Sequence, residues 1–211
     1  MDKYTETFNT WNSVAGLYAG KFMDLDLYDD TYDAFAAAIA KEDARILELG
    51  CGPGNITRYL LNRNPSWQIE AVDMAPNMIA LAEKLNTRAR FRVMDVRNIS
   101  MIATAGTYNG IICGFCIPYL DQGEVEKLIG DAYRLLAPGG ILYCSFEEGD
   151  YEQSGFLTGS SGDRVYFYYY AATELAEMIR HGSFRLTDTF SKAYINNDES
   201  VATHVIMIAR K

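Results

Sequence analysis

The stretch Ile46-Leu47-Glu48-Leu49-Gly50-Cys51-Gly52-Pro53-Gly54-Asn55 decides the fold, because it predicts a strand that runs into a glycine-rich turn and opens a helix. Its three glycines stand at every second position, so the backbone can adopt positive φ and approach a ligand closely. An apolar helix face follows, carried by Ile56, Tyr59 and Leu60. Free backbone N–H groups and the positive end of a helix dipole suit a carboxylate or a phosphate. The turn therefore predicts a nucleotide-like ligand, without naming it.

Composition favours one globular domain with a substantial core, because 49% of the 211 residues are hydrophobic. A net charge of −9 opposes attraction to a polyanion, so nucleic acid is not an expected partner. We see no signal peptide and no long apolar span, and we therefore expect a cytoplasmic protein with no membrane partner. These features leave the oligomeric state open.

Four cysteines, Cys51, Cys113, Cys116 and Cys144, fall in or beside expected strand ends. We expect reduced thiols that pack in the core. Cys113 and Cys116 form a C-x-x-C pair, but no second Cys or His pair follows at metal-binding spacing. No metal site is therefore predicted.

Strands and helices alternate through the middle of the chain. We expect strands at 44–49, 67–73, 91–95, 108–114 and 141–146, and two more strands at 184–194 and 201–209 that form a closing antiparallel hairpin around 196–199. Right-handed crossovers require a parallel sheet with helices on both faces, and ligands then bind at the carboxyl ends of the strands.

We expect a single domain over 1–211 with four parts. These are an N-terminal cover of two helices (1–40), a cofactor-binding core (41–146), an insertion over the rim (147–172), and a final helix and hairpin (173–211). The cover either packs onto the domain or places Tyr18 or its neighbours against the ligand. The insertion contains a glycine- and serine-rich stretch at 154–162 and the aromatic run 166–170. That run predicts either a buried strand or a substrate lid.

The glycine spacing narrows the ligand. A dinucleotide fingerprint, G-x-G-x-x-G, requires glycine where this chain has Asn55. The spacing G-x-G-x-G in 47–54 instead resembles the first motif of the class I S-adenosylmethionine-dependent methyltransferases. The resemblance continues in order through Ala71-Val72-Asp73-Met74, Met94-Asp95-Val96 and Leu135-Leu136-Ala137-Pro138-Gly139-Gly140. It implies an α/β fold, namely a Rossmann-like, mostly parallel seven-stranded sheet with helices on both faces and a C-terminal antiparallel hairpin.

The resemblance also implies S-adenosyl-L-methionine as cofactor and S-adenosyl-L-homocysteine as product. Asp73 would accept hydrogen bonds from both ribose hydroxyls. Asp95 would accept one from the adenine amino group, and the N–H of Val96 would reach a ring nitrogen. Glu48 would help to hold the ammonium group. The other expected cofactor-binding residues are Tyr18, Gly50, Cys51, Gly52, Met74, Cys113 and Phe115.

The implied reaction is transfer of a methyl group to a small-molecule acceptor by in-line displacement, in which positioning supplies most of the catalysis. The alternatives are a nicotinamide-dependent oxidoreductase and a non-catalytic S-adenosylmethionine-binding protein. No catalytic residue is predicted. His181 lies at an expected helix end and His204 within an expected strand, so neither is expected to act as a base.

The sequence contains weaker signals for the methyl acceptor than for the cofactor, and the acceptor atom (N, O, S or C) stays open. Amino-directed nucleic-acid methyltransferases carry Asp, Asn or Ser where this chain has Cys116, in the run Phe115-Cys116-Ile117-Pro118-Tyr119, and this departure disfavours adenine methylation. Tyr119 is a candidate substrate contact, with simple packing as the alternative. Tyr166 and Tyr168 are candidate substrate contacts from the insertion.

Overall fold

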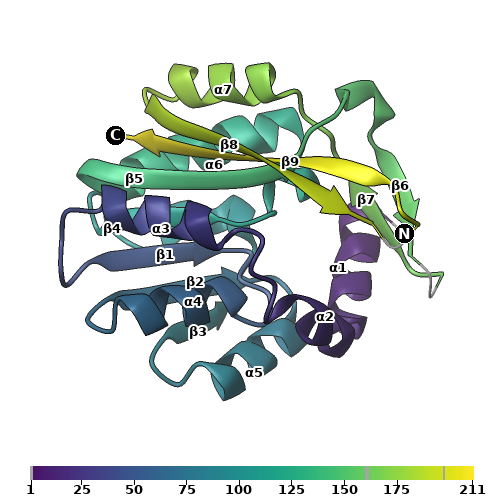
Figure 1. Cartoon of the computed structure of the whole chain (residues 1–211), viewed down its shortest axis with the longest axis horizontal. Coiled ribbons are helices and arrows are strands. Elements are labelled where there is room, and N and C mark those ends of the chain that lie inside the picture. Colours follow the sequence, from purple (N-terminus) through teal and green to yellow (C-terminus); the bar gives the residue numbers. More distant parts are fainter. Residues whose placement is uncertain (1, 160–161, 197) are drawn as a thin grey trace.

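A seven-stranded sheet forms the centre of the protein in the computed structural model, which describes residues 2–159, 162–196 and 198–211. Its strands are β1 (Arg45–Leu49), β2 (Gln68–Asp73), β3 (Arg90–Val93), β4 (Tyr108–Cys113), β5 (Leu136–Glu147), β8 (Arg185–Ile195) and β9 (Val201–Arg210), in the spatial order β3-β2-β1-β4-β5-β9-β8. The first five strands are parallel, whereas β9 runs antiparallel to both β5 and β8. The predicted mostly parallel sheet with a terminal hairpin is confirmed (Figure 1). Of the expected hairpin turn, residue 197 lies outside the described residues.

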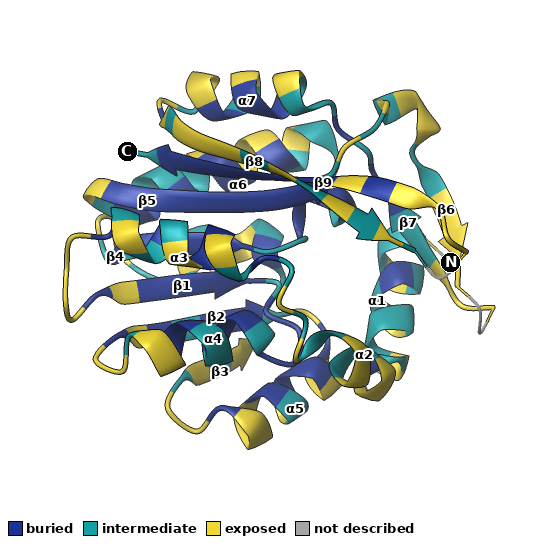
Figure 2. Cartoon of the chain, in the orientation of Figure 1, coloured by how far each residue is buried: buried dark blue, intermediate teal, exposed yellow. Residues whose placement is uncertain are grey.

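Helices cover both faces of this sheet. They are α3 (Asp29–Ala38), α4 (Asn55–Arg63), α5 (Pro76–Leu85), α6 (Gln122–Leu135) and α7 (Ala172–His181), and a 3₁₀ helix spans Val96–Met101. Neighbouring residues of a strand point to opposite faces, and in β1 Ile46 packs in the buried cluster under α3 and α4, whereas Leu47 packs in the cluster under α6 and α7. Figure 2 shows the central strands buried and the outer faces of the helices exposed.

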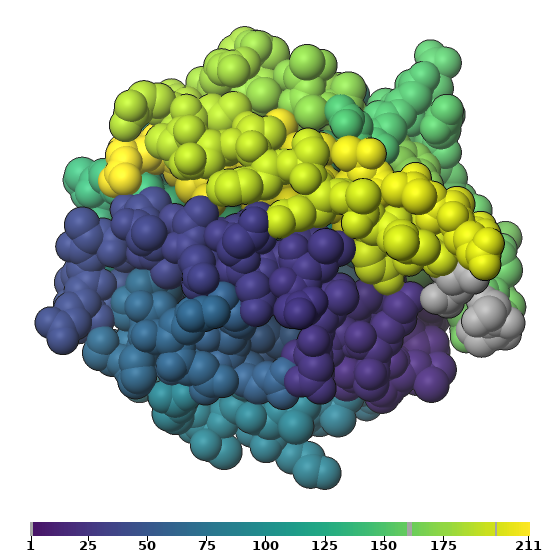
Figure 3. Space-filling model, viewed as in Figure 1, coloured from purple at the N-terminus to yellow at the C-terminus, as the bar shows by residue number. Residues whose placement is uncertain are grey.

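The N-terminal segment has three helices, so the prediction of two was wrong. The expected first helix divides into α1 (Lys3–Ser13) and α2 (Ala15–Phe22), because Val14 leaves helical geometry at φ −92° and ψ 8°. The rings of Trp11 and Tyr18 meet edge to face across this break, with centroids 5.6 Å apart. Figure 1 shows α1 and α2 near the carboxyl ends of the parallel strands, beside α5. In Figure 3 the purple N-terminal segment joins the yellow C-terminal hairpin in one continuous surface.

The insertion is a small antiparallel hairpin of β6 (Gly155–Thr158) and β7 (Arg164–Phe167). Residues 160 and 161 of its expected glycine- and serine-rich stretch lie outside the described residues. The hairpin is bonded to α1, because the N–H of Tyr166 donates to Thr7 Oγ1 at 2.9 Å and Thr10 Oγ1 donates to the carbonyl of Arg164 at 2.6 Å. The insertion and α1 therefore form one layer near the carboxyl ends of the parallel strands (Figure 1).

Gly110 in β4 lets α3 pack closely on the sheet. A β-carbon there would lie 2.7 Å from both Ile39 Cδ1 and Phe35 Cζ. We expect Gly110→Ala to lower the free energy of unfolding by about 1–3 kcal/mol, on the scale of core overpacking, in urea denaturation. Gly16→Ala in α2 is the control, because no heavy atom lies within 4 Å of its β-carbon position, and it should raise stability by about 0.5–1 kcal/mol. Unchanged stability of Gly110→Ala would contradict this packing.

Candidate active site

The glycine turn between β1 and α4 has the predicted geometry. All three glycines have positive φ, at 65°, 52° and 84° for Gly50, Gly52 and Gly54. A β-carbon on Gly54 would lie 2.4 Å from Asn86 Nδ2, and this same amide donates to the Gly54 carbonyl at 3.2 Å. The turn therefore needs glycine both for its backbone conformation and for its close approach to α5.

A first cavity opens beside this turn, at the carboxyl ends of β1, β2 and β4. Its walls include eight of the residues predicted to bind the cofactor, namely Tyr18, Gly50, Gly52, Asp73, Met74, Asp95, Val96 and Phe115. The cover supplies the opposite wall through Tyr4, Phe8 and Trp11. The structure thus brings together most of the expected cofactor-binding residues, which lie far apart in the sequence.

Asp73 is the last residue of β2 and lines the first cavity, and backbone hydrogen bonds to both of its carboxylate oxygens orient the side chain. Oδ2 accepts from the N–H of Gly52 and Oδ1 from the N–H of Ala75, each at 2.8 Å. Burial raises the pKa of Asp73, and these backbone hydrogen bonds partly offset that effect. Each carboxylate oxygen can accept more than one hydrogen bond, so both remain able to accept from a vicinal diol.

Asp95 is paired with Arg97, a contact that the sequence analysis did not predict. The guanidinium donates to both carboxylate oxygens, with Nη2–Oδ2 at 2.6 Å. Burial would raise the pKa of Asp95, but the hydrogen bonds and the charge of Arg97 together leave it lowered. An adenine amino group at Asp95 would therefore share this carboxylate with Arg97. Asp95 and Arg97 are two positions apart at the end of a predicted strand, and this spacing does not predict an ion pair.

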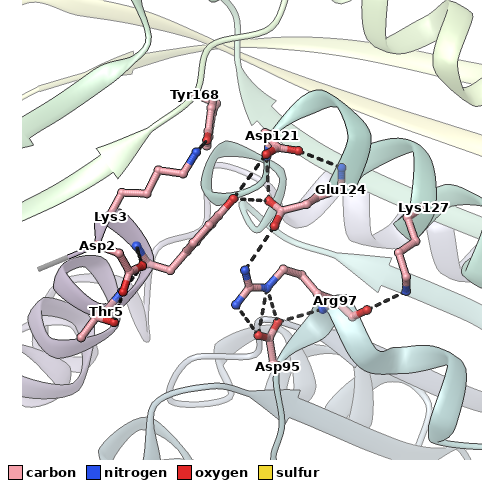
Figure 4. Close-up of polar contacts among 10 residues, drawn as sticks. Asp2, Lys3, Thr5, Asp95, Arg97, Asp121, Glu124, Lys127 and Tyr168 are labelled. Atoms are coloured by element: carbon pink, nitrogen blue, oxygen red, sulfur yellow. Dashed lines mark hydrogen bonds and ion pairs between the residues drawn. The ribbon is translucent and has the colours of Figure 1, made fainter.

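Arg97 also connects the cavity to the cover (Figure 4). Its Nη1 lies 3.2 Å from Glu124 Oε1 in α6, and the hydroxyl of Tyr4 donates to Glu124 Oε2 at 2.6 Å. The guanidinium carbon lies 4.2 Å from the centroid of the Tyr4 ring. These contacts hold α1 over the part of the cavity that contains Asp95.

Tyr166 and Tyr168, the candidate substrate contacts from the insertion, are not among the residues that line the first cavity or the second cavity described below. Both rings pack around Lys3 of α1, whose Nζ lies 5.2 and 5.0 Å from the centroids of Tyr166 and Tyr168. Lys3 Nζ also donates to the Tyr168 hydroxyl (Figure 4). Because side chains alternate along a strand, Phe167 between them points the other way and lines a second cavity.

This second cavity adjoins the first. The two share Trp11, Tyr18, Gly50, Gly114, Phe115 and Tyr119 in their walls. Tyr119, the candidate substrate contact, therefore lies where the cavities meet. Phe115 also lies there and has a positive φ of 53° although it is not glycine; its N–H donates to Ser145 Oγ at 2.9 Å. Such backbone strain costs about 1–3 kcal/mol and is concentrated at functional sites.

His204, which was not expected to act as a base, lines the second cavity. Its Nδ1 lies 2.6 Å from the hydroxyl of Tyr28, and its Nε2 lies 3.8 Å from Glu147 Oε2. The antiparallel pairing of β5 with β9 places Glu147 directly opposite His204. The sequence could not show this, because it does not reveal the register of two strands 57 positions apart. His181, by contrast, is exposed at the end of α7.

Glu48 and Cys113, which the sequence analysis expected at the cofactor, are buried and are not among the residues that line either cavity. Cys113 packs in the core under α6. Glu48 is 1% exposed beneath the glycine turn; it accepts a hydrogen bond from the Thr57 hydroxyl, and its Oε1 has no partner. Burial raises the pKa of Glu48 to about 8. Cys51 lines the second cavity.

Within the described residues, no cluster of three His, Cys, Asp or Glu side chains could hold a metal ion. In the same part of the chain, no helix is both long and apolar enough to span a membrane.

Comparison with known proteins agrees with this geometry. Residues 46–140 match the methyltransferase domain family. This similarity covers the segment from β1 to α6, including the glycine turn. It is 33% identical over 110 residues to a demethylmenaquinone methyltransferase of Thermus thermophilus, covering 50% of this chain and 48% of the relative. It is 31% identical over 146 residues to a malonyl-[acyl-carrier protein] O-methyltransferase of Paenibacillus, covering 62% and 50%.

A solved methyltransferase structure shares the fold over nearly the whole chain. This is the Burkholderia thailandensis 1,6-didemethyltoxoflavin-N1-methyltransferase with bound 1,6-didemethyltoxoflavin and S-adenosylhomocysteine, at a TM-score of 0.73 and 21% identity, covering 98% of this chain and 88% of that one. The chain spans about half the length of the two sequence relatives named above. The match to the methyltransferase domain extends over residues 46–140, and the substrates of the relatives do not transfer with it.

Proposed function

We propose that this protein transfers a methyl group from S-adenosyl-L-methionine to a small-molecule acceptor. The observation that carries the proposal is the meeting of two cavities at Phe115 and Tyr119. The first cavity has the glycine turn and Asp73 for the amino acid and ribose parts of the donor. The second has room on the far side of the same residues for an acceptor.

The residues present fit the donor. The cavity side of Gly52 is open except for Tyr18 Cε1, 3.5 Å from a β-carbon placed there, so the backbone can lie directly against a bound chain. Asp73 holds this turn through the N–H of Gly52 and keeps acceptor capacity toward a diol. These features support a pocket for adenosine beside a surface for an amino acid tail.

The donor, when bound, supplies an activated methyl group on a sulfonium. The protein's part is to hold the acceptor in line with that methyl group and to exclude water. Well-oriented pairs reach effective molarities on the order of 10⁵ M or more, so positioning can supply most of the catalysis. The aromatic walls shared by the two cavities, Trp11, Tyr18, Phe115 and Tyr119, suit both tasks.

Calorimetric titration tests the donor half of this function and separates it from the oxidoreductase alternative. We expect saturable binding of S-adenosylhomocysteine and none of NAD, because Asn55 stands where the dinucleotide fingerprint requires glycine. Binding of NAD in preference to S-adenosylhomocysteine would contradict the proposal. Tight binding of S-adenosylhomocysteine, with no turnover of S-adenosylmethionine by a broad metabolite library, would instead favour a non-catalytic binding protein.

A further inference from the structure

We propose that the second cavity binds an uncharged, flat aromatic acceptor that carries a ring N–H or O–H group, and that His204 accepts the proton which this group loses. This inference rests on the proposed function, because it assigns the acceptor half of the same site. It concerns the cavity bounded by α2, the loop before α3, β7 and the β8–β9 hairpin.

The walls of the second cavity are mainly aromatic. Phe22, Tyr28, Phe115, Phe167 and Tyr194 contribute rings from five separate segments. Three of these rings surround the imidazole of His204, with centroids 4.8 Å away for Tyr194, 4.7 Å for Phe115 and 6.0 Å for Tyr28. The Tyr194 ring is nearly parallel to the imidazole, at 14°. Flat, closely spaced walls favour a flat ligand, because stacked and edge-to-face ring pairs gain about 0.5–1.5 kcal/mol beyond area burial.

The charges around the second cavity disfavour a carboxylate acceptor. Among the described residues that line it, Glu147 is the acidic side chain and no Lys or Arg is present. Lys21 is not a lining residue, although its Nζ lies 5.1 and 5.7 Å from the ring centroids of Phe22 and Tyr194. Lys192, opposite His204 in the β8–β9 pairing, is bound to Asp30 at 2.6 Å. An anionic acceptor would meet Glu147 with no Lys or Arg in the cavity wall to offset the charge, which is costly in a desolvated site.

His204 is held in one orientation and keeps one ring nitrogen within reach of a ligand. Its Nδ1 lies 2.6 Å from the Tyr28 hydroxyl, and the proposed step uses the tautomer in which Nδ1–H donates to the Tyr28 oxygen, so that Nε2 carries the free lone pair. Its Nε2 lies 3.8 Å from Glu147 Oε2, which is beyond hydrogen-bond distance. One donor atom of an acceptor can therefore contact both Nε2 and Oε2 from the cavity. Burial raises the pKa of Tyr28, so its phenol stays protonated and does not compete for the proton.

The proton and electron balance of this step is complete. The lone pair on the acceptor N or O forms a bond to the methyl carbon while the carbon–sulfur bond breaks. The electron pair of the broken bond stays on sulfur, which becomes a neutral thioether. The proton of the acceptor N–H or O–H passes to His204 Nε2. Glu147 stabilises the resulting imidazolium, and the proton then leaves to solvent. No oxidant or reductant is required.

A matched pair of probes tests the acceptor class. We use 7-hydroxycoumarin and 7-hydroxycoumarin-3-carboxylate, at a pH where the ring hydroxyl is protonated, and measure S-adenosylhomocysteine formed from S-adenosylmethionine. We expect turnover of the uncharged probe and at least tenfold lower kcat/KM for the carboxylate. Equal or better turnover of the carboxylate, or of an aliphatic amine, would overturn the assignment, as would an inactive 7-hydroxycoumarin.

A matched pair of variants tests His204 itself, since the chain contains only two histidines. His204→Gln should lower kcat for 7-hydroxycoumarin by about 10²–10⁴-fold, the usual contribution of general base catalysis. His181→Gln, at the exposed end of α7, should leave it unchanged. Unchanged kcat in His204→Gln would remove His204 from the reaction. Calorimetric affinity for S-adenosylhomocysteine should be the same in both variants, which shows that they are folded.

Imidazole nitrogen NMR gives a readout that does not depend on turnover. Adding S-adenosylhomocysteine and 7-hydroxycoumarin together should shift the ¹⁵N resonances of His204 and leave those of His181 in place. A spectrum with neither histidine shifted would overturn the placement of the acceptor. Failure of the underlying function looks different, because the wild-type protein would then not bind S-adenosylhomocysteine at all.

Discussion

Asp73→Ala should weaken S-adenosylhomocysteine binding by about 2 kcal/mol or more, roughly 30-fold, because hydrogen bonds to a charged group are worth about 1.5–3 kcal/mol. The substitution removes the proposed acceptor of the ribose hydroxyls. It also releases the N–H groups of Gly52 and Ala75, which Asp73 now holds at 2.8 Å. Isothermal titration calorimetry measures the loss directly.

Two control variants make this result specific. Asp26→Ala removes an exposed carboxylate before α3 and should leave the affinity unchanged. Asp73→Asn keeps the size and the acceptor oxygen but removes the charge, and we expect its affinity to fall between those of the wild type and Asp73→Ala. An Asp73→Ala protein that is folded by circular dichroism and binds as tightly as the wild type would remove Asp73 from the donor site.

Glu48→Gln should abolish most of a pH dependence of stability. Burial raises the folded-state pKa of Glu48 to about 8 from an ordinary value of 4.5. The folded protein therefore keeps a proton that the unfolded chain releases, and stability falls as pH rises from about 4.5 to about 8. With about 1.4 kcal/mol for each pH unit, we expect the wild type to lose about 3 kcal/mol or more between pH 5 and pH 8.5.

Urea denaturation at several pH values tests this prediction. The amide of Glu48→Gln stays neutral, so its free energy of unfolding should change much less over the same range. Asp73 shifts in the same direction and is present in both proteins, so a smaller slope remains. Glu126→Gln, on the exposed face of α6, should keep the full wild-type dependence. If the slope of Glu48→Gln equals that of the wild type, Glu48 is ionised in the folded protein.

The sequence predicted the sheet and the first cavity well because their signals are local. Period-two and period-3.6 apolar patterns define the strands and helices, and the three glycines define the turn that joins β1 to α4. Parallel strands bring their carboxyl ends to one edge of the sheet. Asp73 and Asp95 therefore line the same cavity although they are far apart in the sequence.

The features that the sequence missed depend on packing between distant segments. Val14 breaks the expected first helix into α1 and α2, and its φ and ψ are set by the packing of these two helices. The alternation of side chains along β7 places Phe167 on one face and Tyr166 and Tyr168 on the other. The sequence does not show which of these faces packs on α1 and which faces a cavity. His204 meets Glu147 only through the β5–β9 register. Each of these facts required the tertiary structure.

The most direct test of the donor and acceptor assignment is a crystal structure with S-adenosylhomocysteine. We predict that both ribose hydroxyls donate to Asp73, that the amino acid tail follows Gly50 to Gly52, and that the sulfur lies at the junction beside Phe115 and Tyr119, open to the second cavity. A sulfur that faces away from the second cavity, or a ligand bound outside the first, would contradict it.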